Sequence, residues 1–220
     1  VKRDNIPDVE NLQKAIKKCK DSNADEPDAY KFFSKAEKVL AQEYIDVLRI
    51  SDHNTRGLEG SDSCKKGSSW SRLVKENGSS NKGQSSGGSF GIGKSATFAC
   101  SDLRTVFYSS LDIKGLRSNI GVAKLISFQD EKLGWTTGVG YYSEDDKFVA
   151  IPELINFDDS YERNDTGTDI YILGMCKTED FEGEFIEAIL LNFLVSLIKG
   201  KLEVDVQGNI IKRDTLATYI

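Results

Sequence analysis

A glycine-rich stretch near the middle of the chain has the residue types needed to hold phosphate groups. Residues 88–95 read GSFGIGKS and contain Gly88, Phe90, Gly91, Gly93, Lys94 and Ser95. Glycines permit tight turns in which several backbone amides face one point, and a helix that begins there adds the positive end of its dipole. The sequence therefore predicts that anionic oxygens bind at this loop.

Two other polar stretches stand at the ends of apolar runs. In the first, Asp52, Asn54 and Gly57 follow the run YIDVLRIS. In the second, Thr168 follows Gly167 and begins the run TDIYIL. Taken alone, each pattern is also typical of an ordinary turn beside a strand. Only their combination with the glycine-rich loop indicates a site.

The elements that must position these residues follow from periodicity. Helices are expected over residues 9–19, 30–43, 94–100 and 181–199, and strands over 44–51, 104–110, 120–128, 135–142, 147–151 and 168–173, with a terminal hairpin over 202–211. Successive strands without helices between them favour an antiparallel sheet. The fold class expected is therefore α+β, a mostly antiparallel or mixed sheet with helices packed on one face.

Residues 59–89 have a composition of their own. Ten serines and six glycines occur there, with five lysines or arginines against three acidic residues. A segment of this length without apolar periodicity is typical of a lid, a binding loop or a disordered insertion. We therefore expect a helical segment at 1–43, a binding domain at 44–200 with a mobile lid at 59–89, and a hairpin or the start of another domain at 201–220.

Composition limits the classes of protein to which the chain can belong. It has 220 residues, of which 39% are hydrophobic, and a net charge of −6. Such a charge gives no overall attraction to nucleic acids or anionic membranes, and no apolar run reaches the length of a membrane span. Four dispersed cysteines and a single histidine favour reduced thiols and a cytoplasmic location.

The three motifs, in this order and with a lid-like segment between the first two, resemble the GHKL ATPase superfamily. Gyrase B, the ninety-kilodalton heat-shock chaperone, histidine kinases and MutL belong to it. The resemblance covers residues 44–173, and the F-G-x-G form at residues 90–93 is most similar to the chaperone and MORC-type branches. It implies an α/β sandwich that binds ATP with Mg²⁺ and changes conformation when its lid closes.

The resemblance also implies a role for each matching residue. Asp52 would accept a hydrogen bond from the adenine amino group, supported by Thr168 through water, and Asn54 shares its turn. Gly57 would let the backbone pass close to the base. Gly91 and Gly93 would form the phosphate turn, and Lys94 lies where a cation could meet the β- or γ-phosphate.

Two departures from the family pattern bear on activity. The stretch D-H-N-T-R-G replaces the usual D-x-G-x-G, and no E-x-x-x-N helix, which carries the Mg²⁺ ligand and the general base, occurs within residues 1–43. Either that helix precedes this chain in a longer protein or the chain is a degenerate ATPase. The lack of an initiating methionine favours the first, so we expect partners in further domains and in a second copy, and little hydrolysis by this chain.

Two alternative functions stay open. Residues 88–95 also match G-x-x-x-x-G-K-S, the loop of a P-loop NTPase, in which Lys94 and Ser95 would contact phosphate and Mg²⁺. That loop requires a buried strand leading into Gly88, and the preceding NKGQSSG cannot supply it. The other alternative is a non-catalytic nucleotide-sensing or protein-interaction module whose partner contacts residues 59–89.

Overall fold

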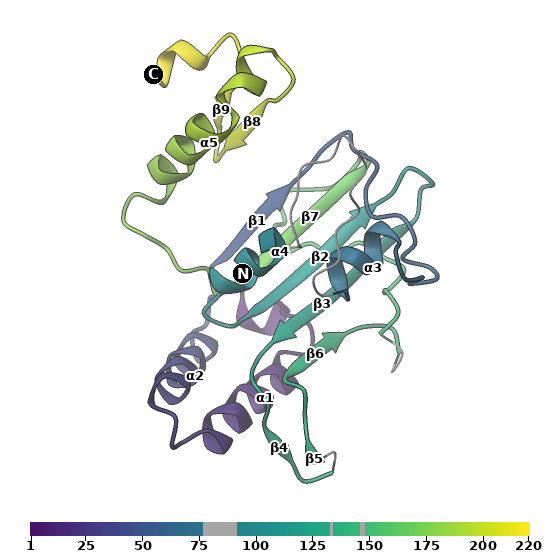
Figure 1. Ribbon diagram of the computed structural model, residues 1–220, viewed down its shortest axis with the longest axis vertical. Coiled ribbons are helices and arrows are strands. Elements are labelled where there is room, and N and C mark those ends of the chain that lie inside the picture. The colour runs from purple at the N-terminus through teal and green to yellow at the C-terminus, as the bar shows by residue number, and fades with distance from the viewer. Residues whose placement is uncertain (77–91, 133, 146–147) are drawn as a thin grey trace. The chain divides into compact units, whose positions relative to one another are not determined.

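A computed structural model describes residues 1–76, 92–132, 134–145 and 148–220. The chain forms two compact units, Val1–Cys176 and Lys177–Ile220, which are coloured from purple to green and from green to yellow in Figure 1. The candidate site residues lie in the first unit. Gly88, Phe90 and Gly91 lie outside the described residues.

The first unit is built on a five-stranded sheet with the order β1-β7-β2-β3-β6 (Figure 1). Every neighbouring pair in it is antiparallel. Valine, isoleucine and aromatic residues are frequent in its central strands, as expected for a buried pleated surface. The strands are β1 (Val47–Ser51), β2 (Thr105–Leu111), β3 (Arg117–Lys124), β6 (Val139–Tyr142) and β7 (Gly167–Leu173). The expected α+β class with an antiparallel sheet is confirmed.

Helices α3 (Ser69–Val74) and α4 (Ile92–Ala99) cover one face of this sheet. Trp70 and Phe98 are buried there against Val106, Tyr108 and other sheet residues. The expected helix at 94–100 is thus present. Because alternate side chains of a strand point to opposite faces, the neighbours of Val106 and Tyr108 in β2 belong to the other face.

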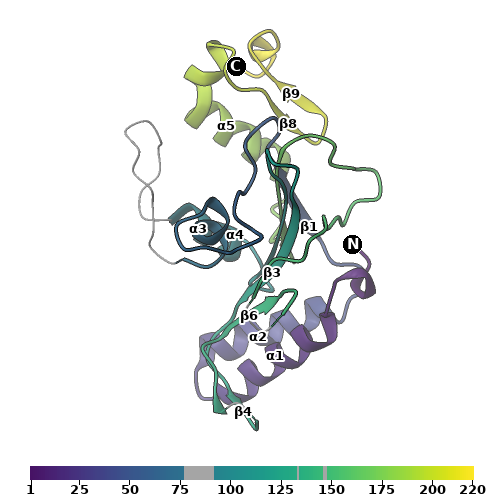
Figure 2. The ribbon, with the colours of Figure 1, turned by 90° about the vertical axis from the view of Figure 1, so that its right-hand side faces the viewer.

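Helices α1 (Val9–Ser22) and α2 (Pro27–Leu40) pack on that other face. Ile16 and Phe33 share a buried cluster with Leu103, Phe107 and Tyr171 of the sheet region. Figure 2 shows α3 and α4 on one side of the sheet and α1 and α2 on the other. The helices therefore occupy both faces, whereas one face was expected. Amphipathic spacing predicts that a helix buries one side but not which sheet face receives it.

The segment at 59–89, expected to lack structure, is ordered over residues 59–76. It folds into turns and α3, and Trp70 within it has no exposed surface. The Ser68 side chain accepts a hydrogen bond from the Ser71 amide and caps the helix. A single tryptophan thus supplies a large buried anchor that the lack of apolar periodicity did not predict, and the role of this segment as a lid stays a prediction. Residues 77–89 of the expected lid lie outside the described part of the chain.

Smaller elements complete the first unit. A 3-10 turn, η1, covers Arg3–Asn5, and a short hairpin joins β4 (Gln129–Asp130) to β5 (Gly134–Trp135). The strand expected at 147–151 is reduced, among the described residues, to an isolated bridge between Asn119 and Ile151. The other predicted strands agree with the observed ones to within a few residues.

The second unit contains a helix and a hairpin with their own core. Its elements are α5 (Phe181–Ile198), β8 (Val204–Val206), β9 (Asn209–Ile211) and a 3-10 turn, η2 (Leu216–Thr218). Leu197, Val206, Ile211 and Leu216 are buried together. The terminal hairpin is as predicted, but the boundary falls after Cys176 and not after residue 200. None of the helices described has the length and apolar character to cross a membrane.

Candidate functional site

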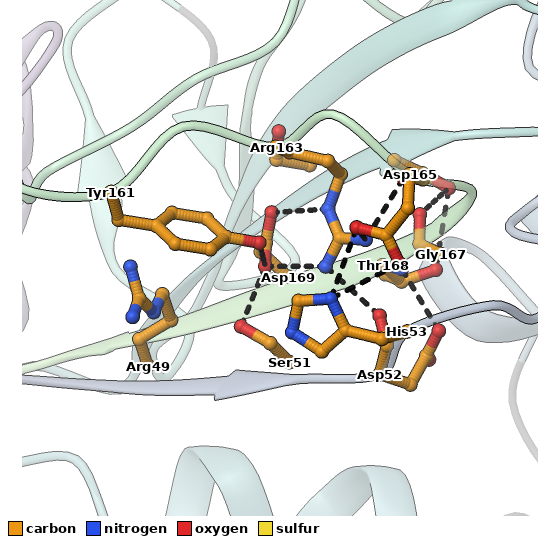
Figure 3. A network of polar contacts seen from close by, with 12 residues as sticks. Arg49, Ser51, Asp52, His53, Tyr161, Arg163, Asp165, Gly167, Thr168 and Asp169 are labelled. Atoms are coloured by element: carbon orange, nitrogen blue, oxygen red, sulfur yellow. Dashed lines mark hydrogen bonds and ion pairs between the residues drawn. The ribbon is translucent and has the colours of Figure 1, made fainter. Parts of the chain in front are cut away.

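The predicted residues Asp52 and Thr168 meet where β1 ends and β7 begins. The pairing of Ser51 with Asp169 continues past the strand, because the Asp52 amide donates to the Thr168 carbonyl at 3.0 Å. The Thr168 amide in turn donates to Oδ1 of the Asp52 carboxylate, also at 3.0 Å. Figure 3 shows the two residues side by side. The antiparallel pairing of two motifs distant in sequence thus creates one site.

The Asp52 carboxylate is oriented by two donors on the same oxygen. Besides the Thr168 amide, the Thr55 hydroxyl donates to Oδ1 at 2.6 Å. The side chain is exposed, and Oδ2 has no hydrogen bond to any residue that the structure describes. A fixed carboxylate with one free oxygen can accept a hydrogen bond from a ligand without first reorganising.

The Thr168 hydroxyl lies on the same face as the Asp52 side chain and is buried. Its oxygen is 3.3 Å from the Ser110 hydroxyl, which itself donates to the Gly167 carbonyl at 3.0 Å and accepts from the Leu58 amide at 2.8 Å. Since Ser110 uses its only proton on Gly167, Thr168 donates to Ser110. The lone pairs of Thr168 then stay available as acceptors.

An apolar strip adjoins the carboxylate. Ile50 pairs with Ile170 across β1 and β7, and each is two residues from Asp52 or Thr168 along its strand. Two-residue spacing places all four side chains on the same face. Ile50 is 42% exposed although it lies in the sheet. The site therefore combines an apolar floor with a free carboxylate oxygen, which suits a flat ring that carries an N–H donor.

Glycine is required at two positions around this site, for steric reasons. A Cβ on Gly167 would lie 2.2 Å from the Asp52 carbonyl oxygen. At Gly57, which has a φ of +61°, a Cβ would lie 2.5 Å from the Leu111 carbonyl oxygen. This contact is with the backbone at the end of β2, and the expected approach of Gly57 to a base stays a prediction.

A buried ion pair supports Asp52 from the opposite face (Figure 3). The Arg163 guanidinium donates to both carboxylate oxygens of Asp169 at 2.7 Å, and both side chains are 2% exposed. The same guanidinium donates to the Asp52 carbonyl oxygen at 3.0 Å. Arg163 thus links the backbone of the site residue to the strand β7. Its role could not be predicted from the sequence, because a lone arginine in a polar loop belongs to no recognisable pattern.

Asp169 has further partners that keep it charged. Ser51 and Tyr161 donate to its Oδ1 at 2.6 and 3.0 Å. Burial alone would raise the pKa of Asp169, but the hydrogen bonds from Arg163 and Ser51 and the charge of Arg163 hold it below its ordinary value. Arg49 stacks on the Tyr161 ring, with its guanidinium carbon 3.6 Å from the ring centre. Asp169 is therefore ionised, and both of its carboxylate oxygens accept hydrogen bonds.

Asp165 fixes the turn that follows Asp52. One of its oxygens lies 3.0 Å from Nδ1 of His53, and the other accepts from the Asn54 amide at 3.0 Å. Burial opposes ionisation, but these bonds keep the pKa of Asp165 below its ordinary value. Asn54 has a φ of +56°, a conformation that asparagine adopts more readily than most residues. Asn54 therefore acts in the geometry of the turn.

The described part of the glycine-rich motif belongs to α4. The Lys94 ammonium donates to the Arg72 carbonyl oxygen at 3.0 Å, and burial together with the nearby Lys124 lowers the pKa of Lys94. Ser95 is exposed. Gly93 lies in the helix, and a Cβ there would meet nothing within 4 Å. The described conformation therefore gives Gly93 no steric reason to be glycine and directs Lys94 toward α3.

A hollow lies elsewhere in the first unit. A cavity of about 490 Å³ opens beside α1 and β6, and its wall includes Leu12, Phe107, Phe128, Trp135 and Tyr142. Its lining is mainly apolar. It contains neither Asp52 nor Thr168, so the two sequence motifs do not converge on it.

Neither a metal-binding cluster among the described residues nor a known relative helps to identify the site. Within the described ranges, no group of three histidine, cysteine, aspartate or glutamate side chains could hold a metal ion. Comparison of the chain with protein-family models, curated proteins and solved structures found no match.

Proposed function

We propose that the chain binds an adenine nucleotide at Asp52 and serves as the ATP-binding part of a GHKL-type ATPase. In this proposal, nucleotide binding is coupled to conformational change in a larger protein. The observation that carries it is the Asp52 carboxylate, whose Oδ1 is held by Thr55 and Thr168, while Oδ2 has no hydrogen bond to a described residue and the neighbouring Ile50 is exposed.

The chemistry of this arrangement favours adenine over guanine. A carboxylate only accepts hydrogen bonds, so the exocyclic amino group of adenine is a matched partner for Oδ2. Guanine presents a carbonyl oxygen at the same position and would be repelled. Ile50 and Ile170 offer the ring an apolar surface, and the lone pairs of Thr168 can hold a bridging water.

The phosphates would extend toward the glycine-rich motif. Gly93 lies in the first turn of α4, where helix amides have no partner within the helix and could donate to phosphate oxygens. Because no three-residue acidic cluster occurs among the described residues, Mg²⁺ would take most of its ligands from phosphate oxygens and water. In this proposal Mg²⁺ neutralises phosphate charge.

The sheet favours this proposal over a P-loop NTPase. A P-loop fold is built on parallel strands, one of which leads into the first glycine. The five strands of the described sheet are antiparallel throughout. Lys94 is also hydrogen-bonded to the backbone of α3, although a P-loop lysine must reach phosphate. A purely protein-binding module would not require a fixed carboxylate with a free oxygen.

Calorimetric titration tests the proposal. Asp52→Asn should weaken ATP binding about 10- to 100-fold, because a charge-assisted hydrogen bond contributes roughly 1.5–3 kcal/mol. An asparagine that keeps the bonds to Thr55 and Thr168 with its oxygen would present an N–H group to the adenine amino group. Asp25→Asn is the matched control, since Asp25 is exposed and lies outside the site.

We expect wild type and Asp25→Asn to bind ATP equally and to prefer it to GTP. Equal affinity of Asp52→Asn and wild type for ATP, or equal affinity of wild type for ATP and GTP, would refute the adenine assignment. An unchanged midpoint of urea unfolding for Asp52→Asn would show that the loss concerns the site and not the fold.

A further inference from the structure

Two cysteines that are distant in sequence lie opposite each other in the first unit. Cys100 directly follows α4, and Cys176 is the last residue of the unit. Between them, Ser101 and Met175 form an isolated antiparallel bridge. The Cys176 amide donates to the Cys100 carbonyl at 3.0 Å, and the Asp102 amide donates to the Gly174 carbonyl at 2.8 Å. Cys100 and Cys176 are therefore the next directly facing pair of this short ladder.

The ladder places the two thiols within reach of each other. Directly opposite residues of an antiparallel pair have Cα atoms about 4.5–5.5 Å apart, and their side chains project on the same side. A disulfide needs a Cα separation of roughly 4.4–6.8 Å. The backbone can therefore accept an S–S bond with a side-chain rotation alone.

Accessibility distinguishes this pair from the other cysteines. Cys100 and Cys176 are exposed, whereas Cys19 is buried and Cys64 is partly buried. The Cys176 thiol donates to Oδ1 of Asp102 at 3.0 Å. Burial, followed by Asp102, raises the pKa of Cys176, and Lys35 opposes this effect. The Cys176 thiol is therefore held by a hydrogen bond, whereas the exposed Cys100 thiol has none to any described residue, so we expect Cys100 to react first.

We propose that Cys100 and Cys176 are a redox-sensitive pair that forms an intramolecular disulfide with a peroxide as the oxidant. The Cys100 thiolate attacks a peroxide oxygen, the O–O bond breaks, and a sulfenic acid and water result when hydrogen peroxide is used. The Cys176 sulfur then attacks the Cys100 sulfur, the S–O bond breaks and a second water leaves. Two thiols are oxidised by two electrons and one peroxide is reduced.

The disulfide would join the end of α4 to the residue at which the first unit ends. It would close the loop of residues 100–176, which includes β2, β3, β6 and β7. Such a cross-link restricts the unfolded chain and holds the C-terminal end of α4 against the end of β7. This inference uses contacts remote from Asp52, so it stands or falls independently of nucleotide binding.

Oxidation of the full chain tests the pair. The native protein is treated with hydrogen peroxide, the remaining thiols are alkylated, and the protein is digested without reductant. Before alkylation the intact monomer should have lost about 2 Da, and the digest should contain a peptide pair that joins Cys100 to Cys176. The oxidised protein should unfold at a temperature higher by roughly 5–15 °C, and a thiol reductant should reverse the shift.

Single variants supply the controls. Cys100→Ser and Cys176→Ser should each abolish the linked peptides and the thermal shift, whereas Cys64→Ser should keep both. In denaturant, peroxide should no longer form the Cys100–Cys176 disulfide in preference to other disulfides. This would show that the fold selects the pair. Mainly intermolecular disulfides, linkage of Cys100 to another cysteine, or sulfinic acid formation without any linked peptide would overturn the proposal.

Discussion

Gly167 lies between Asp52 and Arg163 and leaves no room for a side chain. A Cβ there would be 2.2 Å from the Asp52 carbonyl oxygen and 2.6 Å from Nη1 of Arg163. Gly167→Ala should therefore displace Asp52 and lower the free energy of unfolding by about 2–4 kcal/mol. Urea denaturation measures this effect. Gly140→Ala is the control, because a Cβ at Gly140 meets nothing within 4 Å. Similar stability of the two variants would contradict the steric argument.

Replacement of Arg163 should reverse the direction in which Asp169 makes the free energy of unfolding depend on pH. In the wild type the pKa of Asp169 lies below its ordinary value of 3.8. Its contribution to stability is therefore present above about pH 4 and is lost as the pH falls through the lower, folded-state pKa. Arg163→Met would leave the carboxylate buried without its cation, raise its pKa and cost about 3–5 kcal/mol at neutral pH.

The urea midpoints at pH 7 and pH 5 separate the two cases. In the wild type, the contribution of Asp169 to stability should be the same at pH 7 and at pH 5. Arg163→Met should be more stable at pH 5 than at pH 7, because its buried carboxyl can then be protonated. Arg49→Met is a suitable control, since Arg49 is partly exposed and pairs with Asp158 at 3.1 Å. A variant of Arg163 with the pH dependence of wild type would show that Asp169 does not depend on this ion pair.

Only some of the contacts around Asp52 could be predicted from the sequence. The resemblance to the GHKL superfamily led us to expect Thr168 beside Asp52, and the two residues do lie together. Arg163 and Asp165 could not be expected there, because they belong to a loop without periodicity, and only the folded path of that loop brings them to Asp52. The sequence thus predicts the residues of the proposed ligand contact better than those that hold them in place.

Substitutions in helix α4 should affect the stability of the fold and the binding of the proposed ligand differently. Gly93 has a helical position with free space around it, so Gly93→Ala should stabilise the fold by up to about 1 kcal/mol through helix propensity. A bulkier Gly93→Val should weaken ATP binding more than Lys94→Ala does, because backbone amides would carry most of the phosphate contact. Parallel denaturation and calorimetry on the three variants test this. A greater loss of affinity in Lys94→Ala would favour the P-loop alternative.

The elements themselves were predicted with uneven success, for physical reasons. Alternating β-type residues located β1, β2, β3 and β7, since a pleated strand imposes that spacing. Serine- and glycine-rich composition concealed α3, because a helix of six residues has no detectable periodicity and its burial depends on Trp70. Helix α5 is apolar on most sides, with Leu191 77% exposed, which predicts a helix but not that it forms a separate unit with β8 and β9.

In the proposed function, the placement of α1 and α2 limits what the chain could do with ATP. Both helices pack on the face that carries Phe107 and Tyr171, and the Thr168 hydroxyl and the Asp52 carboxylate belong to the opposite face. No acidic side chain of residues 1–43 is then positioned to activate water at the proposed site. Recognition of adenine does not orient a nucleophile, and general-base assistance alone contributes about 10²–10⁴-fold.

We therefore expect this chain to bind ATP but to hydrolyse it little. Steady-state phosphate release with Mg²⁺, measured beside the binding titration, should stay near the uncatalysed background while ATP saturates the site. Addition of a polypeptide that supplies a glutamate on the face of Asp52 should raise the rate without a matching change in affinity, because general-base catalysis acts on the transition state. Robust turnover that is abolished by Glu10→Gln would instead show that α1 contributes the base, and the assignment of faces to functions would have to be reversed.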